Sequence, residues 1–65
     1  MRLSVNGEAR EVQAATLDAL LAELGYEGVI VATAVNAEFV RSKDRNVRAL
    51  QEDDRIEILT PRQGG

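Results

Sequence analysis

The feature that most constrains the fold is the dipeptide Asn6-Gly7, which separates two short segments of alternating apolar and polar residues. Asn-Gly readily adopts positive φ at both central positions of a type I′ turn, so it favours a two-residue β-hairpin. The strands of this hairpin are expected at residues 1–5 and 8–12. A two-residue turn pairs Leu3 with Arg10, which places the methylenes of Arg10 near the core edge and its head in water.

The residues after the hairpin predict an amphipathic helix over 17–24. Thr16 is a candidate N-cap, Asp18 lies in the first turn where the helix dipole favours an anion, and Gly25 is a natural residue just past the end. The apolar stripe follows the i, i+3, i+4, i+7 spacing of one helix face and consists of Leu17, Leu20, Leu21 and Leu24.

The second half of the chain predicts three further strands. An apolar, β-branched run at 29–35 is expected as a central strand covered on at least part of both faces, followed by a short strand at 38–40 and a closing strand at 55–59. Between them we expect a surface loop at 41–46, one helical turn at 47–50 and a polar turn at 51–54.

This order of elements predicts an α+β fold of the ubiquitin-like β-grasp type. The sheet is expected to be mixed, with about five strands and one main helix packed across it. Residues 1–59 form the predicted domain, and residues 60–65 are expected to be a flexible C-terminal tail that ends in Gly-Gly.

Composition excludes several kinds of chemistry. The sequence has no cysteine and no histidine, so it lacks a thiol nucleophile, the usual neutral-pH general base and the commonest metal ligand. A net charge of −3 and only two aromatic residues, Tyr26 and Phe39, argue against nucleic-acid binding. The chain also shows no signal peptide and no apolar run of membrane-spanning length, so we expect a cytoplasmic protein without a metal or a membrane partner.

The C-terminal Gly64-Gly65 is the candidate reactive group. A carboxylate becomes electrophilic once it is adenylated, and glycines pass a narrow channel because they lack a Cβ. Six extended residues span about 20 Å, enough to enter a neighbouring protein. We therefore expect Gly65 to react, while Gly64, Gln63 and Arg62 enter the active site of a partner. Without cysteine, any sulfur that this chain carries has to be on Gly65.

The whole chain resembles the ThiS family, the sulfur carrier proteins of thiamine biosynthesis. The matching segments are 5–8, 16–21, 31–36, 50–59 and the final Gln-Gly-Gly. The chain departs from the family pattern in three turns: Asn36-Ala37 where the family usually has Asn-Gly, residues 40–42 where a Pro-Arg pair is common, and residues 52–54, Glu-Asp-Asp in place of Asp-Gly-Asp.

The resemblance implies a carrier rather than an enzyme, with no cofactor bound. A ubiquitin-activating-type adenylyltransferase (ThiF-like) would use Mg-ATP to form the Gly65 acyl-adenylate. A cysteine desulfurase or other sulfur donor would convert it to a thiocarboxylate, which would donate sulfide to thiazole synthase (ThiG-like). Other functions remain open: a Gly-Gly carrier for molybdopterin synthesis or tRNA thiolation, a ubiquitin-like modifier, or a β-grasp binding module whose Gly-Gly is incidental.

Two groups of residues are candidates for a partner-docking surface. Phe39 and Leu59 either lie on an open sheet face or belong to the core, and the parity of a short strand does not decide between these positions. Asp53 and Asp54 belong to an acidic turn that either steers the chain toward a basic partner or is simply solvated.

Overall fold

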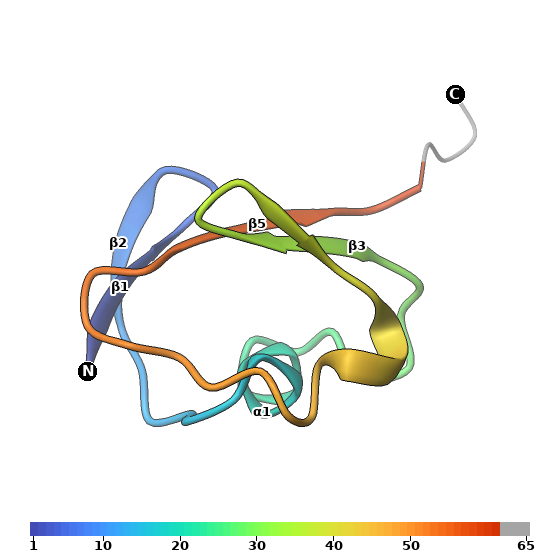
Figure 1. Cartoon of the computed structure of the whole chain (residues 1–65), viewed down its shortest axis with the longest axis horizontal. Helices are drawn as coiled ribbons and strands as arrows, with labels where there is room; N and C mark the ends of the chain where they lie inside the picture. Colours follow the sequence, from blue (N-terminus) through green and yellow to red (C-terminus); the bar gives the residue numbers. More distant parts are fainter. Residues whose placement is uncertain (62–65) are drawn as a thin grey trace.

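A computed structural model describes residues 1–61 and shows a five-stranded sheet with one helix across one of its faces (Figure 1). The strands are β1 (Arg2–Val5), β2 (Glu8–Glu11), β3 (Ala32–Val35), β4 (Glu38–Val40) and β5 (Arg55–Leu59); the helix is α1 (Leu17–Glu23), and a 3-10 turn, η1, spans Ser42–Asp44. The strand order is β2-β1-β5-β3-β4, with β1 parallel to β5 and the other pairs antiparallel. The predicted mixed sheet with one main helix is confirmed.

The N-terminal hairpin has the predicted turn and register. Asn6 and Gly7 have φ values of 51° and 86°, and Leu3 pairs with Arg10. Arg10 is exposed, yet it lines a surface cavity together with Leu24 and Tyr26 on the helix side of the sheet. Its position beside the core edge is therefore as expected.

Helix α1 begins where the sequence predicts and ends one residue earlier, with Leu24 as its C-cap. The Thr16 hydroxyl accepts a hydrogen bond from the Ala19 N–H group at 3.2 Å, and Gly25 follows the helix with a φ of 90°. Leu17, Leu20 and Leu21 are buried against the sheet. Burial of this stripe is the main stabilisation of a helix of only seven residues, because so short a helix is marginal in water alone.

The sheet separates an apolar face under the helix from an open face on the other side. Alternation along β5 sends Ile56 and Ile58 to the core and leaves Leu59 exposed. In β3, Thr33 points to the core and is 2% exposed. Its hydroxyl donates to the Val40 carbonyl at 2.8 Å, which satisfies a polar group inside the apolar layer.

The prediction of a continuous strand at 29–35 is wrong in its first half. Strand β3 begins only at Ala32, while Val29 and Ile30 are 46% and 79% exposed. Gly28, with a φ of 81°, turns the chain, and the Val29 N–H group bonds back to the Tyr26 carbonyl at 2.9 Å. The apolar run therefore begins in a turn. Only its second part, Ala32–Val35, pairs with β5.

The predicted helical turn at 47–50 is also wrong, and the segment predicted as a loop contains η1 instead. The carbonyls of Arg45 and Arg48 accept hydrogen bonds from the N–H groups of Asp18 and Leu17, at 3.1 and 3.0 Å. The first N–H groups of a helix lack partners within it. Because the 45–48 segment supplies those partners to α1, it lies beside the N-terminal end of the helix. Ala49, just after it, forms an isolated bridge with Thr16.

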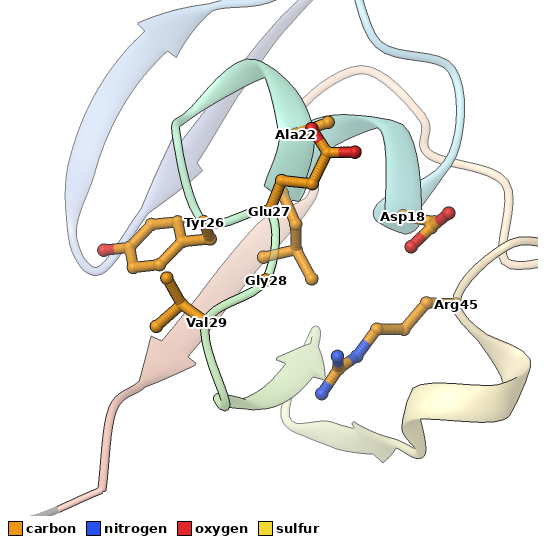
Figure 2. A pocket seen from close by; sticks show the side chains of 8 residues that line it. Asp18, Ala22, Tyr26, Glu27, Gly28, Val29 and Arg45 are labelled. Atoms are coloured by element: carbon orange, nitrogen blue, oxygen red, sulfur yellow. The ribbon is translucent and has the colours of Figure 1, made fainter.

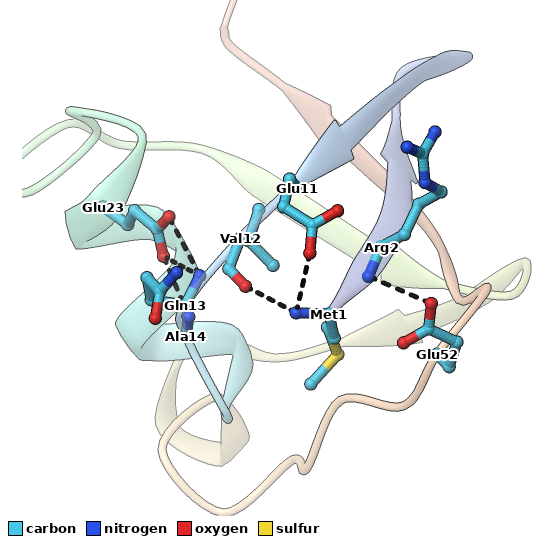
Figure 3. A network of polar contacts seen from close by, with 8 residues as sticks. All are labelled: Met1, Arg2, Glu11, Val12, Gln13, Ala14, Glu23 and Glu52. Carbon is cyan, nitrogen blue, oxygen red and sulfur yellow. Dashed lines mark hydrogen bonds and ion pairs between the residues drawn. The ribbon is translucent and has the colours of Figure 1, made fainter.

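The N-terminal amino group is part of the sheet structure (Figure 3). The Met1 ammonium donates to the Val12 carbonyl at 2.8 Å and lies 3.5 Å from Glu11 Oε2. Near it, the Glu23 carboxylate at the end of α1 accepts a hydrogen bond from the Ala14 N–H group at 2.9 Å. The end of the hairpin is thus fixed both to the first residue of the chain and to the helix.

The turn between β3 and β4 places two non-glycine residues in the left-handed region, where φ is 52° for Asn36 and 71° for Ala37. The left-handed conformation costs an alanine about 1–2 kcal/mol. Ala37→Gly is therefore expected to raise the free energy of unfolding by about 1 kcal/mol, after the larger entropy loss of glycine is subtracted. Urea denaturation followed by circular dichroism measures the change.

Ala9→Gly is the matched control for this prediction. Ala9 lies in β2, is exposed like Ala37, and does not have positive φ. The same substitution there is expected to lower the free energy of unfolding by about 0.5–1 kcal/mol. If Ala37→Gly lowers the free energy of unfolding as much as Ala9→Gly does, residue 37 is not strained.

Candidate functional site: the C-terminal end and the open sheet face

Strand β5 carries the C-terminal end out of the middle of the sheet. It lies between β1 and β3, and it leads away from the side of the molecule where Met1 lies (Figure 1). Thr60 and Pro61 follow the strand and are exposed. The predicted reacting and tail residues, Arg62, Gln63, Gly64 and Gly65, lie outside the described residues.

Beside the point where β5 ends, the open face of the sheet carries an apolar surface, which we call the sheet patch and define as Ile30, Ala32, Ala34, Phe39 and Leu59. Phe39 and Leu59 are 67% and 66% exposed, and Ile30 is 79% exposed. The structure thus places Phe39 and Leu59 on the surface rather than in the core.

The strand register explains why these large side chains lie together. Phe39 in β4 is paired with Ala34, and Leu59 in β5 is paired with Ala32, so two alanines of β3 separate the larger residues. The small side chains leave a shallow apolar cavity of about 80 Å³ between Phe39 and Leu59. An exposed apolar surface of this kind is typical of a protein–protein contact.

Ile30, Ala32 and Ala34 are the patch residues that sequence reasoning missed, because the run 29–35 is predicted as a largely covered strand; Ile30 is the large one. The cavity of about 260 Å³ that Ile30 lines also includes Leu59 and Pro61, so the sheet patch adjoins the last described residue of the chain. The glycine two positions before Ile30, Gly28, was the available indication of a turn.

The two acidic docking candidates have different positions. Asp53 is exposed, with a φ of 70°. Asp54 is only 9% exposed, and its carboxylate accepts hydrogen bonds from Asn36 Nδ2 at 2.9 Å and from the Gln51 N–H group at 2.8 Å. The assignment of Asp54 to an exposed docking surface is therefore corrected: it joins two turns. Glu57, by contrast, lies beside the sheet patch.

A polar cavity of about 150 Å³ lies on the other side of the sheet, between α1 and Arg45 (Figure 2). The Arg45 guanidinium donates to the Val31 carbonyl at 2.7 Å and to Thr33 Oγ1 at 3.1 Å, so it holds the start of β3. This volume is below that of ordinary small-molecule sites. Within residues 1–61, no group of three or more Asp and Glu side chains is arranged to hold a metal ion.

Among the described residues, no helix has the length and apolar character needed to cross a membrane.

The five-stranded mixed sheet with one helix across it defines the class of the protein: it is a ubiquitin-like β-grasp protein. The model of the ThiS family matches residues 3–65. The chain belongs to the ThiS family.

A solved structure agrees with this assignment. The fold is similar to the crystal structure of a thiamine biosynthesis protein (ThiS) from Geobacter metallireducens, with a TM-score of 0.80 and 26% sequence identity over 100% of both chains. A comparison with curated proteins found no match. The predicted β-grasp fold and the resemblance to the ThiS family are both confirmed.

Proposed function

We propose that the chain is a sulfur carrier in thiamine biosynthesis and serves as a protein co-substrate. The Gly65 carboxylate attacks the α-phosphate of Mg-ATP in a ThiF-like adenylyltransferase, which forms an acyl-adenylate and releases pyrophosphate. A persulfide sulfur from a cysteine desulfurase or other donor then displaces AMP. Thiol cleavage of the resulting acyl disulfide leaves a thiocarboxylate on Gly65, which donates sulfide to a ThiG-like thiazole synthase.

The observation that carries this proposal is the family match, which extends through Gly64 and Gly65 to the end of the chain. The geometry of the described residues supports it. The sheet patch adjoins Pro61, so a partner that covers the patch lies beside the point where the described part of the chain ends. Asp53 and Glu57 are exposed, so a basic rim on the partner would favour association.

Intact-mass analysis tests the proposal. The protein is incubated with the adenylyltransferase, Mg-ATP and a sulfur donor, and fragmentation locates any modification. Replacement of one oxygen by sulfur at Gly65 is expected, and it should vanish when ATP is omitted. No adenylate and no thiocarboxylate on an intact chain would overturn the proposal.

A second stage of the same experiment identifies the pathway. The thiocarboxylate form is given separately to thiazole synthase with its substrates, to molybdopterin synthase, and to a tRNA-thiolating enzyme. Thiazole phosphate formation only with the first supports thiamine biosynthesis. Sulfur transfer only to one of the others would reassign the carrier, and attachment to protein lysines would indicate a modifier.

The sheet patch gives a prediction about the first partner. Phe39→Ala is expected to raise the KM of the adenylyltransferase for this carrier by about tenfold or more, because truncation of a hot-spot side chain at the centre of an interface costs about 2 kcal/mol or more. The kcat is expected to stay the same, since Phe39 lies on the body and not on the reacting end. Pyrophosphate release at varied carrier concentration measures both constants.

Val47→Ala is the matched control for the patch. Val47 is 75% exposed and apolar like Phe39, but it lies in the segment after η1, outside the sheet patch. Its KM is expected to remain at the wild-type value. An unchanged KM for Phe39→Ala, or an equal rise for Val47→Ala, would contradict docking through the sheet patch.

A further inference from the structure

Strand β5 is paired with β1 over only part of its length. The parallel pairs are Ser4 with Arg55 and Val5 with Ile56, and the Asn6 N–H group then donates to the Ile56 carbonyl at 2.9 Å. At this point β1 ends, because Asn6 is the first residue of the hairpin turn and has positive φ. The backbone of β1 therefore offers no partner to the last residues of β5.

The side chain of Asn6 continues the pairing where the backbone of β1 cannot. Asn6 Oδ1 accepts a hydrogen bond from the Ile58 N–H group at 2.8 Å, and Asn6 Nδ2 donates to the Ile58 carbonyl at 3.1 Å. One side-chain amide thus binds both polar backbone groups of Ile58, as a residue of a neighbouring strand would. Among the contacts of residues 1–61, Ile58 is the last residue of β5 that is bonded from this side.

On its other edge, β5 is held by β3 through the pair Ala32 with Leu59. The two contacts end within one residue of each other, at Ile58 and Leu59, and Thr60 follows outside the strand. Together they define the point and the direction in which the chain leaves the sheet. Without the Asn6 side chain, β3 would be the remaining strand that pairs with this end of β5 within residues 1–61.

A comparable contact occurs at the opposite end of β5. Asn36, the first residue of the β3–β4 turn, accepts a hydrogen bond from the Arg55 N–H group through Oδ1 at 2.8 Å, and its own N–H group donates to the Arg55 carbonyl at 2.7 Å. Both turn asparagines have φ close to 50°. One asparagine therefore fixes the start of β5 and the other fixes its end.

We propose that Asn6 is a positioning residue, which acts through Ile58 to aim the C-terminal residues into the active site of the adenylyltransferase. This proposal rests on the proposed function. Rates fall when a reacting group is held in the wrong place, and an error of 1 Å can cost about a hundredfold. Since the sheet patch does not include Asn6, loss of the contact affects delivery of the Gly65 carboxylate and leaves docking of the body intact.

The test compares Asn6→Gly with the matched variant Asn36→Gly. Glycine tolerates the positive φ of both positions, so each turn is retained while the side-chain amide is removed. Asn6→Gly is expected to lower the kcat of adenylation by about tenfold with the KM for the carrier unchanged. Asn36→Gly, which releases the far end of β5, is expected to leave both constants unchanged.

Equal kcat values for the two variants, or a rise in KM alone for Asn6→Gly, would overturn the positioning role. If Asn6→Gly does not fold, the same comparison is made with Asn6→Asp, which keeps the acceptor for the Ile58 N–H group and loses the donor to its carbonyl. For Asn6→Asp we expect a several-fold fall in kcat, and an unchanged kcat would contradict the proposal.

Amide hydrogen exchange tests the structural half of the proposal without any enzyme. The Ile58 amide is expected to exchange at least tenfold faster in Asn6→Gly than in the wild-type protein, while the Arg55 amide is affected only in Asn36→Gly. An unchanged Ile58 rate would sink the proposal whatever the kinetics show. If the wild-type chain is never adenylated, the proposed function fails, and the exchange rates still report on Asn6 separately.

Discussion

Deletion of Gly65 is expected to abolish thiocarboxylate formation. The variant ends at Gly64, so its carboxylate is drawn back by one residue, about 3.5 Å in an extended chain. Near-attack geometry requires reacting atoms within about 3–3.5 Å, so a shift of this size removes the carboxylate from the α-phosphate of ATP. Intact-mass analysis of the reaction with the adenylyltransferase, Mg-ATP and a sulfur donor measures the loss, which should be at least a hundredfold in rate.

Gln63→Ala is the matched control, because it changes the neighbouring residue and keeps the terminal Gly-Gly. It is expected to retain at least a tenth of the wild-type rate, with the reach of the chain unchanged. Both variants should unfold in urea at the wild-type midpoint, since the changes lie beyond the sheet. Efficient sulfur transfer to the chain that lacks Gly65 would contradict the assignment of the terminal carboxylate.

Leu20→Ala is expected to remove much of the stability of the domain. Leu20 is 0% exposed and lies in the centre of the leucine stripe of α1. Truncation of a buried leucine costs about 2–5 kcal/mol. A domain of 65 residues has a free energy of unfolding of only about 3–10 kcal/mol, so one such loss removes much of the total.

The control for this prediction is Leu59→Ala, which removes the same atoms from a side chain that is 66% exposed. Its effect on the free energy of unfolding is expected to stay below about 0.5 kcal/mol. Thermal and urea unfolding followed by circular dichroism compare the two variants. A loss of less than about 1 kcal/mol for Leu20→Ala would show that the helix does not depend on this contact.

The elements that the sequence predicts correctly are those that local chemistry determines. The hairpin follows from Asn6-Gly7, and the helix follows from its Thr16 cap and the leucine spacing. Each of these contains its own start, face and end within a few residues. Long-range contacts have little influence on where they form.

The segments predicted wrongly are held by residues far away in the sequence. The start of β3 depends on Arg45, which donates a hydrogen bond to the Val31 carbonyl. The 45–48 segment depends on the first N–H groups of α1, which have no partner within the helix and bond to carbonyls of this segment. The charged residues of 41–48 show no pattern from which either contact could be predicted. Apolar character alone at 29–31 does not distinguish a strand from a turn that exposes Ile30 to solvent.

The candidate site also has one part that the sequence shows and another that depends on long-range contacts. The terminal glycines are visible in the sequence, but the exposure of Phe39 depends on its pairing with Ala34, which only the assembled sheet provides. Asp54 looked like its exposed neighbour Asp53, and the difference arises from the amide of Asn36 in another turn. The sequence predicts the backbone conformation of Asn6 in the hairpin turn. It does not predict that the Asn6 side chain contacts a strand about fifty residues later in the chain.

The ion pair and hydrogen bond of the Met1 ammonium affect how this protein should be handled. An affinity tag at the N-terminus would replace that charged group with a peptide bond, and a tag at the C-terminus would block Gly65. Since the sequence contains no cysteine, Lys43→Cys would introduce a unique thiol on the exposed η1 turn. A fluorophore attached there would report on binding to the adenylyltransferase while Met1 and Gly65 are left unchanged.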